Sequence, residues 1–224
     1  HMDEVGLIVS HIDETGFIYF SCLGGFDAKT LVCQEVTIHG KQRITGVIGC
    51  KPIHCMKQEE KKQLPEIADL YIDTGYSYEE IITKVSVGSP VTRNKQFKKL
   101  GHNITGKALD NRLSVFTLIE VVKSLKSIKC DNYAVFTSQE ELGLRGAYIA
   151  TNTIKPDIGI CLDTTIANDL PDVPKRKYVT QLGQGPAIKL MDSGVVTDRA
   201  LTNFILKIAD SENIDTQREI MTGG

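Results

Sequence analysis

The 224-residue sequence has no tryptophan, no long apolar run and no Cys-x-x-Cys pair. A membrane-spanning helix needs an apolar run of about 18 residues or more, so the sequence predicts no membrane partner. Lysine and arginine number 26 against 28 acidic residues, which gives a formal net charge of −2. This near balance provides no general attraction to nucleic acid or to an anionic lipid surface. We therefore expect neither of them as a partner.

The cysteines are scattered and no signal-peptide pattern opens the chain. Scattered cysteines in a chain of this size are typical of reduced thiols in a reducing compartment. We therefore expect a cytoplasmic protein without disulfides. The six positions are Cys22, Cys33, Cys50, Cys55, Cys130 and Cys161.

The first hundred residues have the pattern of a compact β-rich unit. Short runs rich in β-branched residues are separated by polar turns, one of them Asp13-Glu14-Thr15-Gly16. A helix is expected to follow Ser77, because serine is a good N-terminal cap and two glutamates occupy the first turn. The expected elements are two hairpins (5–9 with 16–20, and 32–39 with 44–48), a strand at 70–73 and a helix at 77–85.

Beyond about residue 105 the pattern changes to alternating helices and strands, which indicates an α/β layered sheet. The helix at 111–125 carries apolar residues on most of its surface and is expected to be largely buried. The near-continuous apolar run at 157–162 is typical of a central strand. The remaining expected elements are helices at 144–152 and 198–212 and strands at 132–137, 187–191 and 215–221.

Acidic residues collect where these strands end. Glu140 and Glu141 follow one apolar strand, Asp163 ends the next, and Asp110 precedes a helix that it would also suit as a cap. In open α/β sheets, ligands bind outside the carboxyl ends of the strands. Carboxylates brought so close repel one another, and a divalent cation relieves that repulsion. One glutamate of the pair can then hold metal while its neighbour takes a proton from water.

Several motifs make the chain similar to a known family. The motifs are His1-Met2-Asp3-Glu4-Val5-Gly6, Gly46–Pro52, Gly106-Lys107-Ala108-Leu109-Asp110-Asn111-Arg112, Gln139–Ala147 and Leu162-Asp163. On these motifs the chain resembles, over essentially its whole length, the tetrahedral or glutamyl aminopeptidases of peptidase family M42.

The resemblance implies two divalent metal ions per subunit, zinc or cobalt. Asp110 matches the ligand that bridges both metals, Glu141 matches a ligand of one, and His1 and Asp163 match ligands of the other. Glu140 matches the general base, and Asp3 matches the residue that orients the first histidine. Substrate-binding residues stay unassigned.

The resemblance also implies an architecture and an assembly. A layered α/β/α metallopeptidase domain is expected from residues 1–6 and 98–224. A small PDZ-like β-barrel is expected as an insertion at 7–97, where it mediates dimerisation. Such dimers build a homo-oligomer up to a dodecamer, whose chamber admits short peptides.

Two departures from the family pattern stand out. All five histidines precede Asp110, so the family's last histidine ligand is missing. The family's N-terminal lead-in is also missing, and the chain stops on Thr222-Gly223-Gly224. We therefore expect the middle of a longer enzyme. The dipeptide His1-Met2 is also a common cloning remnant, but Asp3–Gly6 continues the motif without a break, which favours a native ligand.

Three functions are compatible with these patterns. The first is a two-metal aminopeptidase that removes N-terminal residues from short peptides. The second is a related metal-dependent deacylase or hydrolase, which would not require a free α-amino group. The third is a non-catalytic assembly protein on the same fold, which the missing ligand favours.

Overall fold

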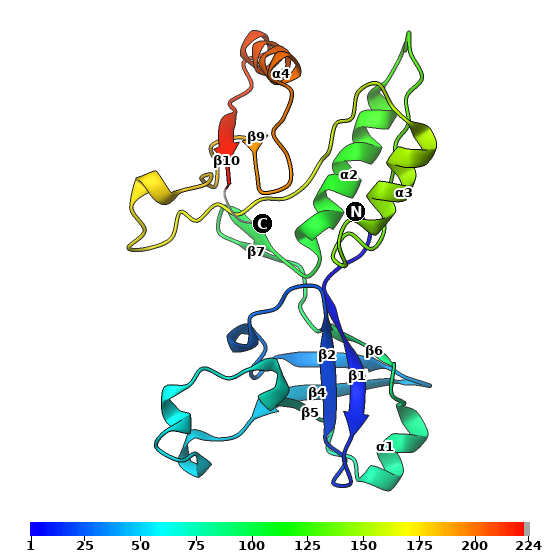
Figure 1. Ribbon diagram of the computed structural model, residues 1–224, viewed down its shortest axis with the longest axis vertical. Coiled ribbons are helices and arrows are strands. Elements are labelled where there is room, and N and C mark those ends of the chain that lie inside the picture. The colour runs from blue at the N-terminus through cyan, green and yellow to red at the C-terminus, as the bar shows by residue number, and fades with distance from the viewer. Residues whose placement is uncertain (222–224) are drawn as a thin grey trace. The chain divides into compact units, whose positions relative to one another are not determined.

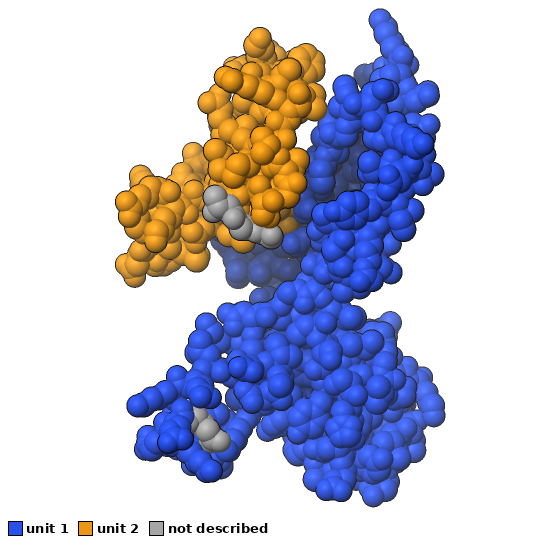
Figure 2. Space-filling view, in the orientation of Figure 1, with its two compact units in different colours: residues 1–163 blue, residues 164–224 orange. Residues whose placement is uncertain are grey.

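The computed structural model describes residues 1–221, with the side chain of Glu60 left out. Residues 222–224, the expected cut in a loop, lie outside the described part. The chain divides into two compact units, residues 1–163 and residues 164–224 (Figure 2). The predicted domain boundaries at 6/7 and 97/98 differ from this division and remain a prediction. None of the helices in residues 1–221 is long and apolar enough to cross a membrane.

A closed six-stranded barrel dominates the first half of unit 1, in the strand order β1-β2-β5-β4-β3-β6 (Figure 1). Every pairing in it is antiparallel. Both predicted hairpins and the predicted strand at 70–73 are confirmed, and the sixth strand was not predicted. The strands are β1 (Gly6–Ile12), β2 (Ile18–Leu23), β3 (Glu35–His39), β4 (Arg43–Cys50), β5 (Leu70–Asp73) and β6 (Pro90–Arg93).

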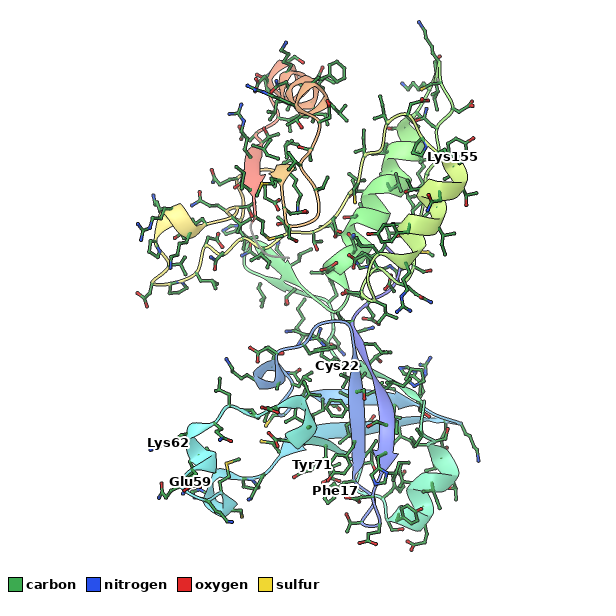
Figure 3. All side chains as sticks on the ribbon, viewed as in Figure 1. Phe17, Cys22, Glu59, Lys62, Tyr71 and Lys155 are labelled. Atoms are coloured by element: carbon green, nitrogen blue, oxygen red, sulfur yellow. The ribbon has the colours of Figure 1, made fainter. Side chains whose placement is uncertain are left out.

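The barrel is filled by the alternate side chains of its strands. In β3, Val36 and Ile38 are fully buried while Glu35, Thr37 and His39 face outward, as the two-residue period of a strand requires. The same cluster takes in Ile81 from helix α1 (Tyr78–Lys84), next to the barrel. On the outside of the barrel, Phe17 packs on Tyr71 with ring centroids 4.7 Å apart (Figure 3).

Local hydrogen bonds explain why two predicted features form. Ser77 Oγ accepts from Glu80 N–H and the Glu80 carboxylate accepts from Ser77 N–H, a capping box that starts α1. Asp13 Oδ1 accepts from the hydroxyl and N–H of Thr15, which tightens the turn between β1 and β2. These bonds lower the pKa of Asp13, because they favour its charged form.

The part of unit 1 after the barrel contains a short hairpin and two helices. The hairpin of β7 (Lys98–Leu100) and β8 (Asn103–Thr105) was not predicted. Helices α2 (Leu109–Ser124) and α3 (Arg145–Ile154) confirm two predicted helices. The expectation that the first of these is largely buried is wrong, since Phe116 is 61% exposed.

The predicted strands at 132–137 and 157–162 are wrong in this structure. Both segments are assigned no strand, and Ile158 and Ile160 are about two-thirds exposed. Apolar composition shows a tendency to be buried, but a strand exists only where a neighbour completes its ladder of hydrogen bonds. Among the described residues, the backbone bond to the first segment is Met2 N–H donating to Thr137 O, 2.8 Å.

Unit 2 confirms the last three predicted elements. Strand β9 (Ala187–Met191) pairs in parallel with β10 (Gln217–Ile220), and α4 (Arg199–Ser211) connects them after its cap at Asp198. The buried Glu219 carboxylate lies 3.1 Å from Lys189 Nζ and accepts from Thr165 Oγ1 at 2.9 Å. The ion pair and hydrogen bond offset the cost of burying that charge.

Candidate metal centre

His1 lies in the segment before β1, and its imidazole is almost fully buried, 2% exposed. Its Nδ1 lies 3.0 Å from the backbone oxygen of Asp3 and 3.4 Å from Asp3 Oδ1. Its Nε2 lies 3.2 Å from Asp110 Oδ1 and 3.4 Å from Glu140 Oε2. One ring nitrogen is therefore held by Asp3, and the other faces carboxylates of two separate segments.

The Asp3 carboxylate also fixes the glutamate pair. Its Oδ1 accepts from Glu140 N–H and its Oδ2 accepts from Glu141 N–H, both at 3.1 Å. A carboxylate that receives two adjacent backbone donors sets the position and direction of that backbone. Asp3 therefore holds His1 through its ring and the two glutamates through their backbone.

The segment that carries the glutamates is folded into a tight turn. Gly143 N–H and Leu144 N–H both donate to Glu140 O at 2.9 Å. Gly146 N–H donates to Ser138 O at 3.0 Å, and a Cβ on Gly146 would lie 2.3 Å from that oxygen. This close approach explains why the motif has glycine at position 146.

Asp110 lies at the start of α2. Asp163 directly follows the extended segment at 157–162. Ala108 is the N-cap of α2, and Asp110 and the next residue, Asn111, have non-helical backbone angles within the first turn. The buried Asn111 side chain donates from Nδ2 to Asp163 Oδ1 at 2.7 Å and to Leu162 O at 3.3 Å. Asn111 therefore positions Asp163 relative to Asp110.

The electrostatics of the cluster disfavour its charged state. Partial burial, together with Asp110 and Glu140, raises the pKa of Glu141 to about 7. Burial and the nearby Asp163 and Asp110 also raise the pKa of Glu140. A bound cation would counter this rise, because it favours the charged form of the carboxylate.

The donor set fits divalent metal ions. Ligand atoms of His1, Asp110 and Glu141 all lie within 4.8 Å of one another, and so do those of His1, Glu140 and Asp163. Such spacing is compatible with metal–ligand bonds of about 2.0–2.2 Å after small side-chain movements. Imidazole with several carboxylates suits zinc and other first-row divalent metals. The four predicted ligands, the predicted base Glu140 and the predicted orienting residue Asp3 therefore lie together in the structure.

Gly24 and Asn111 were not recognised from the sequence as parts of this site. Gly24 has φ +88°, and a Cβ there would lie 2.8 Å from Val5 Cγ1 and 3.3–3.4 Å from the Glu141 side chain. The Gly24-Gly25 pair was a signal for such a close approach, because glycine tolerates positive φ and carries no side chain. For Asn111, the sequence offered a weaker signal than the glycine pair did for Gly24: its position directly after the predicted ligand Asp110.

The raised pKa of Glu141 predicts that the metal-free chain loses stability as pH rises. An unfolded glutamate has a pKa near 4.5, so between pH 4.5 and about 7 the folded chain binds more protons than the unfolded chain. Stability should fall across that window, and Glu141→Gln should reduce the fall. Urea unfolding of both proteins at pH 5 and pH 7.5, with EDTA present, measures the difference. An equal fall in the free energy of unfolding in the two proteins would contradict this prediction.

Gly24→Ala should weaken metal binding about tenfold, because the new Cβ displaces Glu141. Gly88→Ala is a matched control: Gly88 has the same φ of +88° and nothing within 4 Å of a Cβ. Both variants carry the same backbone strain, and only one contacts the cluster. Calorimetric titration with cobalt(II) compares them. A similar loss in both variants would show that strain alone, and not the contact with Glu141, is responsible.

Comparisons with known proteins agree with this site. The family profile of M42 glutamyl aminopeptidase matches residues 1–224. A solved aminopeptidase from the archaeon Desulfurococcus kamchatkensis is 37% identical with a TM-score of 0.94, over 100% of this chain and 63% of its own. The lysyl aminopeptidase of Pyrococcus furiosus is 33% identical, over 98% of this chain and 63% of its own length.

A further solved relative is described as assembling into a tetrahedron or a large octahedral shell. It is the TET1 peptidase of Pyrococcus horikoshii, 31% identical with a TM-score of 0.82, over 100% of this chain and 67% of its own. The chain spans 63–66% of the length of the curated relatives that it matches. With a family profile matched along its whole length and these close α/β structural relatives, this chain belongs to the M42 glutamyl aminopeptidase family.

Proposed function

We propose that the protein is a metal-dependent aminopeptidase that removes N-terminal residues from short peptides. The observation that carries this proposal is the meeting of His1 with the carboxylates of Asp110, Glu140, Glu141 and Asp163 in one cluster. The family relationship supports it, because the matched family profile is that of M42 glutamyl aminopeptidase and a relative that is 33% identical is named a lysyl aminopeptidase. The cytoplasmic location expected from the cysteines stays a prediction.

The donors divide into two sites in this proposal, for two ions of zinc or cobalt. Asp110 is shared, His1 and Asp163 complete one site, and Glu141 belongs to the other. Support comes from the distances around His1 Nε2 and from the raised pKa of Glu141, which the charge of a cation would reverse. Bound divalent ions supply Lewis acidity, which polarises a peptide carbonyl and makes water more acidic.

Glu140 is the general base of the proposed reaction. It takes a proton from the attacking water as the new C–O bond forms. It then passes that proton to the departing amine as the C–N bond breaks. Asp3 holds the backbone of Glu140 in place and orients the His1 ring.

Glu140→Gln and Glu141→Gln should have different consequences for the whole protein. Glu140→Gln keeps the shape but removes the base, so kcat should fall by roughly 10²–10⁴-fold with near-normal metal content. Glu141→Gln removes a ligand, so metal content should fall and added metal should partly restore activity. Peptidase kinetics and metal analysis of both variants test this.

Three outcomes would count against these assignments. Loss of metal from Glu140→Gln with retention in Glu141→Gln would exchange the two roles. Unchanged turnover in both variants would remove this carboxylate pair from the reaction. Equal turnover of a peptide and its N-acetylated form would favour the deacylase or hydrolase alternative, because an aminopeptidase requires a free α-amino group.

We also propose the layered architecture and the assembly that the family implies. The catalytic domain would comprise residues 1–6 and 98–224, and the barrel would be an inserted PDZ-like domain at 7–97 that pairs two subunits. The closed barrel between Gly6 and Arg93 supports this, as does the shell-forming TET1 relative.

Light scattering on the whole protein should give a mass that is a multiple of a dimer, up to twelve subunits. The barrel has its own buried core, which would hold its outer surface in a fixed shape at an interface between subunits. A clean monomer at micromolar concentration would contradict the proposal.

A further inference from the structure

A basic groove lies on the outer face of the barrel, separate from the metal centre. Its cavity measures about 810 Å³. The floor is formed by outward-facing residues of β3, β4 and β6, and its rim is the chain that runs from β6 through β7 and β8 to α2. All of these elements belong to unit 1. We call it the β3/β6 groove.

The charge of the β3/β6 groove is strongly one-sided. Five cationic side chains line it against a single carboxylate, that of Glu35, although the whole chain has a net charge of −2. The cations are Arg43, Arg93, Lys95, Lys98 and Lys107. Such a concentration of one sign in a concave site attracts anions.

Three of these cations have no partner of their own. Within residues 1–221, Arg43, Lys95 and Lys98 take part in no described ion pair or side-chain hydrogen bond, and all three are exposed. Lys107 is paired with Glu4, and the Arg93 guanidinium lies 5.3 Å from the centre of the Phe26 ring. The unpaired cations can therefore bind an external anion without breaking an internal ion pair.

The floor of the groove is fixed by the barrel. Thr37 Oγ1 donates to Asn94 Oδ1 at 2.6 Å, and His39 Nε2 lies 2.9 Å from Thr92 Oγ1. These side chains alternate with core residues on paired strands, so their backbone positions are set by the ladder. A ligand that binds there does not have to order the floor, which lowers the cost of binding.

We propose that the β3/β6 groove binds a peptide segment rich in aspartate and glutamate. Arginine and lysine bind carboxylates through charge-assisted hydrogen bonds, and the planar fork of Arg43 suits a carboxylate especially well. The cavity has the size of a site for a short segment. Nucleic acid is a poorer fit, because no phenylalanine, tyrosine or tryptophan is among the described residues that line the groove, and bases stack on such rings. The proposal does not depend on peptidase activity.

The experiment measures binding of a fluorescently labelled hexaglutamate peptide by anisotropy in low salt. The double variant Arg43→Gln/Lys98→Gln should raise the Kd about tenfold, the loss expected from two exposed charge contacts. Lys126→Gln/Lys129→Gln is the matched control, with the same change of net charge at two exposed lysines outside the groove. It should change the Kd less than about twofold.

A second variant distinguishes the loss of binding contacts from the loss of the fold. Glu35→Gln removes the only carboxylate of the groove and should tighten hexaglutamate binding about two- to threefold, which an unfolded protein would not do. Hexaglutamine should not bind. A Kd above about 1 mM for hexaglutamate, or equal losses in the groove and control double variants, would overturn the proposal. Tighter binding of a six-nucleotide oligothymidine, lost in the groove variant, would replace the peptide with nucleic acid.

Discussion

The carboxylate of Asp3 is the contact on which the metal centre depends. It receives the backbone N–H groups of Glu140 and Glu141 and lies beside Nδ1 of His1. Residues more than 130 positions apart in the sequence are thereby held in one arrangement. Without this carboxylate, the two N–H groups would lose their acceptor and the imidazole its fixed orientation. The second part of the same arrangement is Asn111, which holds Asp163.

The carboxylates of the metal centre are held close together although their negative charges repel one another. Partial burial and the nearby charges of Asp110 and Asp163 raise the pKa of Glu140 and of Glu141, that of Glu141 to about 7. A fold built only for stability would place neutral groups or a lysine there. Perturbed carboxylates that surround one histidine are instead typical of a site whose missing charge is supplied by a bound cation.

Much of the barrel was predictable from local sequence patterns, and the residues of the site were predictable from motifs that resemble those of a known family. Alternation in β3 and the Ser77 cap are local, and the acidic residues lie in recognisable motifs. The predictions of strands at 132–137 and 157–162 were wrong because a strand needs a neighbouring strand to complete its hydrogen bonds. The amino-acid composition of a segment does not show whether such a neighbour is present. Gly24 was missed because its contact is with Glu141, far along the chain. The β3/β6 groove was hidden in the same way, since its cations are diluted in a balanced total charge.

The two extended segments have a thermodynamic consequence for the ligands that they carry. Backbone amides outside a ladder exchange their hydrogens quickly, whereas those of the barrel open only with the barrel itself. Glu140, Glu141 and Asp163 follow segments that belong to no described strand ladder. A cation that binds only the assembled cluster draws this local equilibrium toward order. The free energy of metal binding would then include the free energy of ordering these segments. Binding of the ion and ordering of its ligands would be coupled.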